Sequence, residues 1–356
     1  MSFWENLSSP IIGLAPMDGI TDEPMRQITA QYGQPGVIFT EFVNVEYAAA
    51  RPEKIFNRFW YSSRQRPIVA QLSGVNPNLF YQLAFIAAYL GFDGVDINMG
   101  CPVKSVTARG GGARLINNRP LAKELVLAAK KGLDDWQQGK KITEVADAGL
   151  VTAAKAVQKK NYQRGSKKNQ KIAPALSIKT RPGVNRPLVE DWLAFLLELP
   201  IEALTVHGRL LSAAHSGPVD WESLGQAALI AHQNKKILIG NGGVSSFRQG
   251  QKISQKYYLD GVLVGRAALG NPWVFADRVP NKEERLLVMM KHARYFVECF
   301  GQENFIILRK HLAWYAAGFF GAKKLRSRLV RATSLAEVKK ILNSFTIPDR
   351  EDKANG

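Results

Sequence analysis

The chain has 356 residues, of which 46% are hydrophobic and 22% charged, a balance typical of globular proteins and unlike that of disordered chains. Its 48 Lys and Arg outnumber 30 Asp and Glu, which gives a formal net charge of +18. A charge of this size indicates a polyanionic partner such as a nucleic acid, and the alternative is a basic surface that contacts only solvent.

The two cysteines, Cys101 and Cys299, are far apart in the sequence. They form no CxxC pair, so neither a disulfide framework nor a thiolate zinc site is expected, and a reducing cytoplasm fits best. The first residues do not resemble a signal peptide, and no apolar run reaches the roughly 20 residues of a membrane helix. We therefore expect a cytoplasmic protein with no metal and no membrane partner.

Short apolar runs rich in β-branched residues recur eight times in the first 272 residues, and most are separated by stretches with helical periodicity. The eight runs are IIGLAPM (11–17), VIFTEF (37–42), PIVAQLSG (67–74), GVDINMGCP (94–102), ALSIKTRPG (175–183), ALTVHGR (203–209), ILIGNGGV (237–244) and GVLVGRAALGNP (261–272). Alternating strands and helices predict an α/β fold with a parallel sheet. Eight such units over roughly 250 residues predict a (β/α)8 TIM barrel.

The strand pattern stops at about residue 281, and the stretches EERLLVMMKHARYFVECF, FIILRKHLAWYAAGFF and SLAEVKKILNSF are typical of helices. We therefore predict a barrel domain over residues 1–280 and a helical domain over 281–356. Within the barrel, the connection over about 138–172 is unusually long, and residues 155–171 carry seven basic side chains and no acidic one. We interpret it as a helix leading into a mobile loop, which is either an arm that touches RNA or a solvated insertion.

Polar residues and glycines cluster where the predicted strands end. In a TIM barrel the C-terminal strand ends meet at one rim, where active sites lie. The residues at these ends are Met17, Asp18, Glu41, Gln71, Asn98, Cys101, Lys179, Arg181, His207, Asn241, Gly265 and Arg266. We therefore expect most strands to contribute to one site.

Cys101 lies between Gly100 and Pro102, three residues after Asn98. Proline restricts its own backbone and that of the preceding residue, so the thiol has a defined direction. A thiol with the ordinary pKa of about 8.5 is mostly protonated at neutral pH and can donate a proton. A nucleophilic role would need a nearby base such as His207, and these residues alone leave both roles open. Cys299, in an apolar helical stretch, is expected in the core.

Glycines follow the last two strands, in GNGGV (240–244) and VGRAALGNP (264–272). TIM barrels commonly bind a phosphate here through backbone N–H groups, and Arg266 adds a fixed charge; the alternative is that the glycines only permit tight turns. Lys179 and His207 follow the fifth and sixth strands. Together with a phosphate site they suit a flavin, because its N1/C2=O region becomes anionic on reduction and is stabilised by cations or donors.

These motifs together resemble the FMN-dependent tRNA-dihydrouridine synthases of bacterial type. The matching segments are LAPMDGITD, TEF, VAQLSG, GVDINMGCP, RGGGARL, IKTRPG, VHGR, IGNGGV and VGRAALGNPW. The resemblance spans nearly the whole chain, since RKHLAWYAAGFFGAKKLR (309–326) is similar to the family's C-terminal RNA-binding domain.

The resemblance implies that uridine in tRNA is reduced to 5,6-dihydrouridine, with NADPH reducing the FMN. Reduced FMN would then give hydride to uracil C6, and Cys101 would protonate C5. By motif position, the residues around the flavin ring would be Pro16, Met17, Asp18, Gln71, Lys179 and His207. Those at its phosphate would be Asn241, Gly242, Gly243, Gly265 and Arg266, and Asn98 and Arg181 would face the uracil.

The expected partner of this monomer is tRNA, and the helical domain would supply the surface for it, with thirteen Lys and Arg against five Glu over residues 282–345. Two alternatives are a flavin-dependent reductase of a free pyrimidine or another small molecule, and a non-catalytic RNA-binding protein. The basic helical domain argues against the first, and Cys101 with the flavin residues argues against the second.

Overall fold

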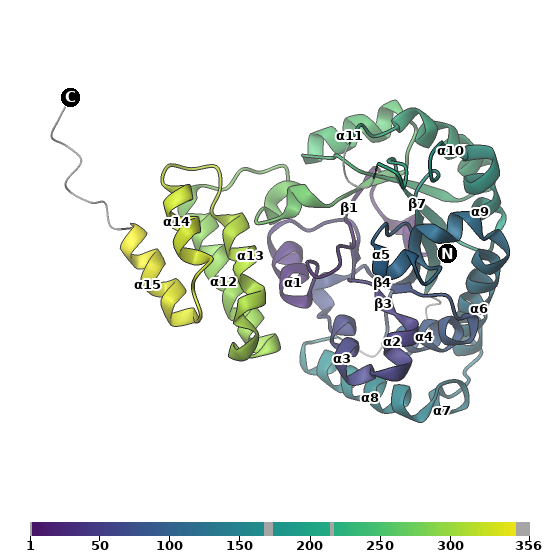
Figure 1. Cartoon of the computed structure of the whole chain (residues 1–356), viewed down its shortest axis with the longest axis horizontal. Coiled ribbons are helices and arrows are strands. Elements are labelled where there is room, and N and C mark those ends of the chain that lie inside the picture. Colours follow the sequence, from purple (N-terminus) through teal and green to yellow (C-terminus); the bar gives the residue numbers. More distant parts are fainter. Residues whose placement is uncertain (1, 167–173, 214–216, 347–356) are drawn as a thin grey trace.

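The computed structural model describes residues 2–166, 174–213 and 217–346. A barrel of strands surrounded by helices forms the larger part, and a bundle of helices lies at its side (Figure 1). No helix in the described part of the chain has the length and apolar character needed to cross a bilayer.

The strands close into a parallel barrel. β1 (Ile11–Leu14) pairs with β2 (Ile38–Phe39) on one side and with β9 (Gly261–Val264) on the other, and β2 also pairs with β4 (Ile68–Ser73). The other barrel strands follow in chain order: β5 (Gly94–Met99), β6 (Ala175–Thr180), β7 (Ala203–His207) and β8 (Ile237–Asn241). A short β3 (Val43–Asn44) pairs with the end of β4. The predicted TIM barrel is confirmed, and each of the eight predicted runs contains one barrel strand.

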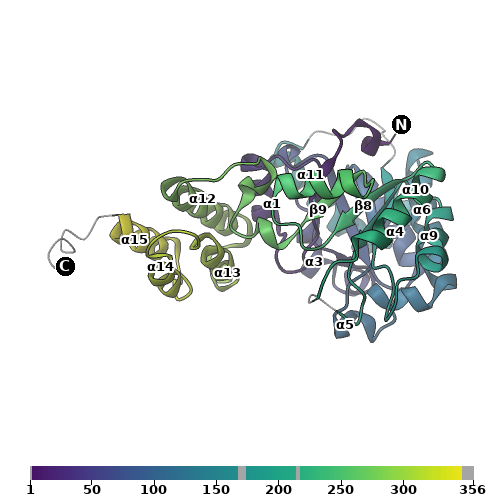
Figure 2. The same cartoon turned by 90° about the horizontal axis from the view of Figure 1, so that it is seen from above.

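Helices cover the outside of the barrel (Figures 1 and 2). The barrel helices are α1 (Glu23–Tyr32), α2 (Val45–Ala50), α3 (Pro52–Ile55), α4 (Pro77–Tyr89), α5 (Lys104–Thr107), α6 (Arg119–Gln137), α7 (Ile142–Val145), α8 (Ala148–Gln163), α9 (Ala194–Glu198), α10 (Trp221–Gln233) and α11 (Phe247–Lys256). Asp22, Asn76 and Asn118 begin α1, α4 and α6, where each side chain accepts the backbone N–H three residues later, and a proline stands in the first turn of each helix. Because helices cover the sheet, every residue of β1, β4 and β5 is buried, which explains why these strands are mainly apolar.

The helix between β6 and β7 has an unusual start. The stretch VEDWLAFLLEL begins as a π-helical turn (Val189–Leu193) and only then continues as α9. The indole Nε1 of Trp192 donates to Thr180 Oγ1, 3.0 Å away at the end of β6. This buried hydrogen bond ties the wide turn to the barrel wall.

The helical region contains α12 (Lys282–Phe300), α13 (Phe305–Tyr315), α14 (Ala322–Leu329) and α15 (Leu335–Thr346). Its apolar core continues into the barrel, because Ile28 of α1 and Trp273 belong to the same buried cluster. α1 and α12 lie side by side in both views (Figures 1 and 2). Gly270 has a φ of +62°, and a Cβ there would lie 2.4 Å from the backbone carbon of Trp314. The loop after β9 therefore packs tightly against α13.

The long connection over about 138–172 contains α7 and α8, and its residues 167–172 lie outside the described residues. Lys160 Nζ lies 3.4 Å from the centre of the Trp60 ring, and Trp60 stacks on Phe300 of α12. Arg164 pairs with Glu23 of α1 at 2.7 Å. The described end of the connection is therefore docked against both the barrel and the helical region and does not extend into solvent.

Cys299 is buried, as expected, but its surroundings are polar. Its thiol donates to Glu23 Oε2 at 2.9 Å and accepts from Arg164 Nη2 at 2.9 Å. Burial and the neighbouring Glu23 carboxylate raise the pKa of the Cys299 thiol to about 12, so the thiol stays protonated at neutral pH.

Candidate active site

A cavity of about 540 Å³ opens at the C-terminal ends of the barrel strands. All fourteen residues predicted from the sequence line it: Pro16, Met17, Asp18, Gln71, Asn98, Cys101, Lys179, Arg181, His207, Asn241, Gly242, Gly243, Gly265 and Arg266. The structure therefore brings the whole set together, as the convergence of strand ends in this fold requires. The role of each residue stays a prediction.

A chain of hydrogen bonds runs under the cavity to the Cys101 loop. The buried Asp96 of β5 accepts from Gln71 Nε2 at 2.7 Å, and Gln71 Oε1 accepts from Asn98 Nδ2 at 2.9 Å. Asn98 Oδ1 then accepts the backbone N–H groups of Gly100 at 3.2 Å and Cys101 at 3.0 Å. The amide groups of Gln71 and Asn98 are thereby oriented, and the loop that carries the thiol is fixed from below.

The Cys101 thiol lies at the cavity wall, half-buried. Burial raises the pKa of this thiol above its ordinary value, and Asp18 raises it further, while Arg181 and Lys179 act in the opposite direction. The net upward direction keeps the sulfur protonated at neutral pH. This environment suits a proton donor better than a nucleophilic thiolate, whose pKa would need to be lowered.

Two cations of β6 and its loop flank the thiol. Burial lowers the pKa of Lys179 to about 8, with Arg181 acting in the same direction, and this leaves Lys179 mostly charged at pH 7. Arg181 Nε donates to Gly100 O at 2.9 Å, and its Nη1 donates to Leu210 O at 3.0 Å. Arg181 therefore links the Cys101 loop to the loop after β7.

Asp18 faces the cavity from the loop after β1, and its position is fixed by an ion pair. Arg58 Nη1 lies 2.7 Å from the Asp18 carboxylate, and Arg58 Nη2 lies 3.7 Å from Glu41. Glu41, which the sequence also placed at a strand end, is buried and accepts the Gly19 N–H at 2.8 Å. It therefore supports the loop and does not line the cavity.

The far end of the cavity combines glycines with two guanidinium groups. Gly242 and Gly243 have φ of +123° and +68°, which L side chains rarely adopt, and a Cβ at Gly242 would lie 3.4 Å from Arg209 Nη1. Arg266 lowers the pKa of Arg209, after the larger effect of burial. Two cations that repel one another beside an open glycine backbone are stabilised by an anion.

Sequence reasoning missed Arg209 as a site residue. Its signal was the motif VHGR, in which Arg209 follows His207 by two positions at the end of a strand. Its Nε donates to Gly217 O at 2.8 Å, so a contact within the loop after β7 turns the guanidinium toward the cavity. A contact inside a loop follows no periodic pattern in the sequence, so the direction of Arg209 could not be predicted.

The cavity also has apolar walls. They are formed by Met17, Ile20, Phe42, Pro102, Val103 and Leu263. With apolar walls, two cations and an anion site in one lining, the cavity can hold a flat aromatic group that carries an anionic tail.

The profile of the family described as "Dihydrouridine synthase (Dus)" matches residues 13–162 and 174–350, which cover both the barrel and the helical region. This chain belongs to the dihydrouridine synthase family. Dihydrouridine carries two more hydrogens than uridine, so the family's product requires a reduction and the prediction of an oxidoreductase is confirmed. Membership of this family indicates a flavin-dependent enzyme.

Sequence relatives align with nearly the full length of this chain. A protein of Staphylococcus epidermidis named "Probable tRNA-dihydrouridine synthase" is 29% identical over 354 residues, which are 97% of this chain and 96% of that protein. A "Probable tRNA-dihydrouridine synthase 2" of Bacillus subtilis is 29% identical over 355 residues, again 97% and 96% of the two chains. Among solved structures, a mutant morphinone reductase in complex with tetrahydroNAD aligns with a TM-score of 0.43 and 15% identity, over 75% of this chain and 86% of that one.

Proposed function

We propose that this chain is a tRNA-dihydrouridine synthase that uses FMN as cofactor and NADPH as reductant. The observation that carries the proposal is the combination, in one cavity, of a protonated thiol, the cations Lys179 and Arg181, and a glycine and arginine anion site. The names of the full-length relatives and the net charge of +18 support tRNA as the substrate. We further propose that the protein acts as a monomer in the cytoplasm, where its tRNA substrate is found.

The residues present fit FMN. The phosphate would be held by Asn241, Gly242, Gly243, Gly265 and Arg266, together with Arg209. Pro16, Met17 and Asp18 would line the ring, Gln71 would bond its edge, and Lys179 and His207 would lie at its pyrimidine side. When bound and reduced by NADPH, FMN supplies a hydride to C6 of the uracil.

The protein supplies the proton and the orientation. We propose that the Sγ–H of Cys101 protonates C5, so that hydride and proton together add two hydrogens across the C5–C6 bond while NADPH becomes NADP+. Asn98 and Arg181, predicted to face the uracil, also hold the Cys101 loop through their bonds to Gly100. Both therefore act as positioning residues for the thiol.

The decisive test is reduction of a defined RNA. The purified protein, which we expect to be yellow, is incubated with NADPH and an unmodified tRNA transcript, and dihydrouridine is measured by mass spectrometry of the digested RNA. Dihydrouridine in the tRNA supports the proposal. Reduction of free uridine or uracil without reduction of tRNA would favour the small-molecule reductase, and a colourless protein that binds tRNA without reducing it would favour a non-catalytic RNA-binding protein.

We expect charge reversal on α14 to weaken tRNA binding. Lys323 and Lys324 are exposed on this helix, next to the exposed Arg326 and Arg328. The double variant Lys323→Glu/Lys324→Glu should lower tRNA affinity and reduce the slope of log affinity against log salt by about 1 to 2, since each lost phosphate contact removes about 0.9. Filter binding at several salt concentrations measures both quantities.

The matched control for α14 reverses two exposed lysines on outer barrel helices, Lys123→Glu/Lys252→Glu. It has the same change in net charge and should have a smaller effect on the salt slope. Equal slopes for the two double variants would show that only net charge matters and would remove α14 from the RNA interface.

We expect Arg266→Ala to weaken FMN binding and leave riboflavin binding unchanged, because riboflavin lacks the phosphate. A hydrogen bond to a charged group contributes about 1.5–3 kcal/mol, so the dissociation constant for FMN should rise about 10- to 100-fold. Flavin fluorescence titration of the apoprotein measures both ligands. Arg248→Ala, which removes an exposed arginine paired with Asp277, is the control, and equal losses for FMN and riboflavin would place Arg266 away from the phosphate.

A further inference from the structure

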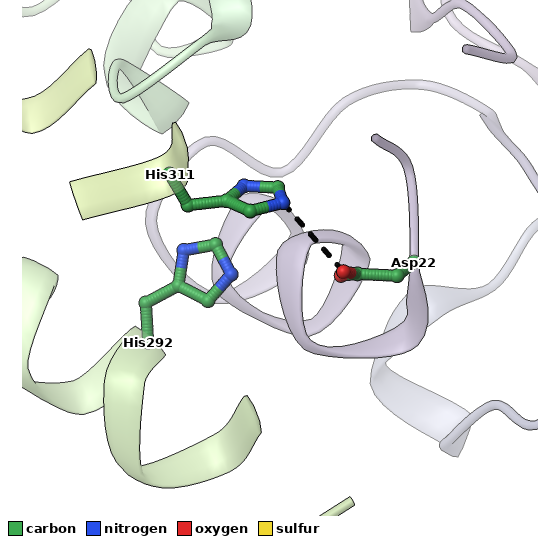
Figure 3. Close-up of side chains that lie close together, drawn as sticks. All are labelled: Asp22, His292 and His311. Carbon is green, nitrogen blue, oxygen red and sulfur yellow. Dashed lines mark ion pairs between the residues drawn. The ribbon is translucent and has the colours of Figure 1, made fainter. Parts of the chain in front are cut away.

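Three buried side chains meet where the barrel contacts the helical region (Figure 3). Asp22 lies in the loop between β1 and α1, His292 on α12 and His311 on α13. One ligand atom from each lies within 4.8 Å of the others. Asp22 Oδ2 is 3.6 Å from His311 Nε2, which is longer than a hydrogen bond.

The protein leaves two nitrogen atoms of this group unsatisfied. His292 and His311 are only 1% and 2% exposed, and the Nε2 atom of each has no hydrogen-bond partner among the described residues. Figure 3 shows both rings turned so that these nitrogens face the Asp22 carboxylate. Buried polar atoms normally have a partner, so two such atoms aimed at one point indicate a missing ligand.

The second polar atoms of Asp22 and His292 already have partners. Asp22 Oδ1 accepts the Met25 N–H at 2.9 Å as the N-cap of α1, which leaves Oδ2 to face the histidines. His292 Nδ1 lies 3.2 Å from the Tyr315 hydroxyl. If Nδ1 carries the proton and donates it to Tyr315, Nε2 presents a lone pair, which is the arrangement found behind histidines that bind metals.

We propose that Asp22, His292 and His311 bind a divalent transition-metal ion of the Zn²⁺ class at the junction of the barrel and the helical region. Two imidazole nitrogens and one carboxylate oxygen form a donor set that Zn²⁺ favours. Ligand distances of about 2.0–2.2 Å place two donor atoms of a tetrahedral site about 3.4 Å apart. The ligand atoms of the three side chains now lie within 4.8 Å of one another, so no pair would need to approach by more than about 1.5 Å. The sequence predicted no metal site because no short spacing links residues 22, 292 and 311.

The ion would join the two parts of the chain. Asp22 belongs to the barrel and caps α1, whereas the two histidines belong to different helices of the other region. A ligand that binds only the folded, docked arrangement stabilises it. The site is therefore structural, and it lies apart from the Cys101 cavity, whose lining contains none of the three residues.

The test uses the full-length protein stripped with EDTA and then titrated with Zn²⁺ or Co²⁺ alone. We expect one tightly bound ion per chain by elemental analysis, a melting temperature that rises with Zn²⁺, and a Co²⁺ absorption spectrum of tetrahedral type without a thiolate band. His311→Gln and His292→Gln should lose the stoichiometric ion. Asp22→Asn retains the N-cap and should weaken binding by at least about tenfold, since even outer partners of metal ligands contribute 10- to 100-fold.

Two controls separate this site from adventitious binding. His232→Gln removes an exposed histidine on α10, and Cys299→Ala removes the nearby thiol; both should retain the ion. No stoichiometric Zn²⁺ in the wild-type protein, or full binding in both His292→Gln and His311→Gln, overturns the proposal. These readouts need neither flavin nor tRNA, so they are independent of the proposed reaction.

Discussion

Replacing Cys101 by alanine is expected to reduce the rate of uridine reduction in tRNA by about 10²- to 10⁴-fold, the usual contribution of a positioned acid. The loss should fall on the step in which reduced flavin reacts with tRNA, because the thiol is proposed to protonate C5. Flavin content and flavin reduction by NADPH should stay unchanged. Stopped-flow absorbance of the flavin separates the two half-reactions.

The pH profile gives a second readout of the same thiol. A proton donor is active below its pKa and loses activity as the pH rises through it. Since burial raises the pKa of Cys101, ionisation of this thiol should lower the wild-type rate with tRNA only above about pH 8.5, where an ordinary thiol would ionise, and a fall near pH 8 would report Lys179. Cys299→Ala is the matched control, because it removes the other cysteine without touching the cavity. A Cys101→Ala protein with the wild-type rate at neutral pH would show that another group donates the proton.

Replacing Arg26 by methionine is expected to destabilise the protein by about 3–5 kcal/mol, the usual cost of removing one partner from a buried set of charges. Arg26 is fully buried on α1, and its guanidinium donates to Thr21 O at 2.6 Å, Trp60 O at 2.5 Å and Gln65 Oε1 at 3.1 Å. Without Arg26, these oxygens lose a donor and the buried Glu23 loses a nearby cation. Urea unfolding followed by fluorescence measures the change in the free energy of unfolding.

Two variants test the cause of this destabilisation. Arg26→Lys retains the charge but not the planar fork of donors, so it should lose less stability than Arg26→Met. Arg64→Met removes an exposed arginine and should change stability by no more than about 0.5 kcal/mol. If Arg26→Met were as stable as Arg64→Met, the buried hydrogen bonds would contribute nothing net to folding.

The barrel and the residues that line its cavity could be predicted because both follow from the repeated strand pattern. Eight apolar runs fix eight parallel strands, and closure of the sheet brings residues as distant as Met17 and Arg266 to one rim. Residue type at each strand end then indicates the chemistry. For this reason a cysteine between glycine and proline could be assigned to the cavity before the structure was known.

Features that depend on contacts between loops or between regions could not be predicted in this way. The position of Arg209 depends on its bond to Gly217, and the polar partners of Cys299 come from α1 and from the end of α8. The basic connection was interpreted as a helix leading into a mobile loop; α8 is that helix, but the packing of Lys160 and Arg164 against Trp60 and Glu23 was not foreseen. Side chains that meet only after docking share no spacing in the sequence.

The docking of α8 against both regions has a consequence for substrate choice. Phe300 on Trp60, Cys299 between Glu23 and Arg164, and the shared apolar core connect α12 to the barrel at several points. We expect a protein braced in this way to change shape little on binding, so that the tRNA itself bends and releases the base. With α14 as the proposed RNA contact, the span between this helix and Cys101 would be constant, and a uridine would be selected by how far it lies from the RNA segment held at α14.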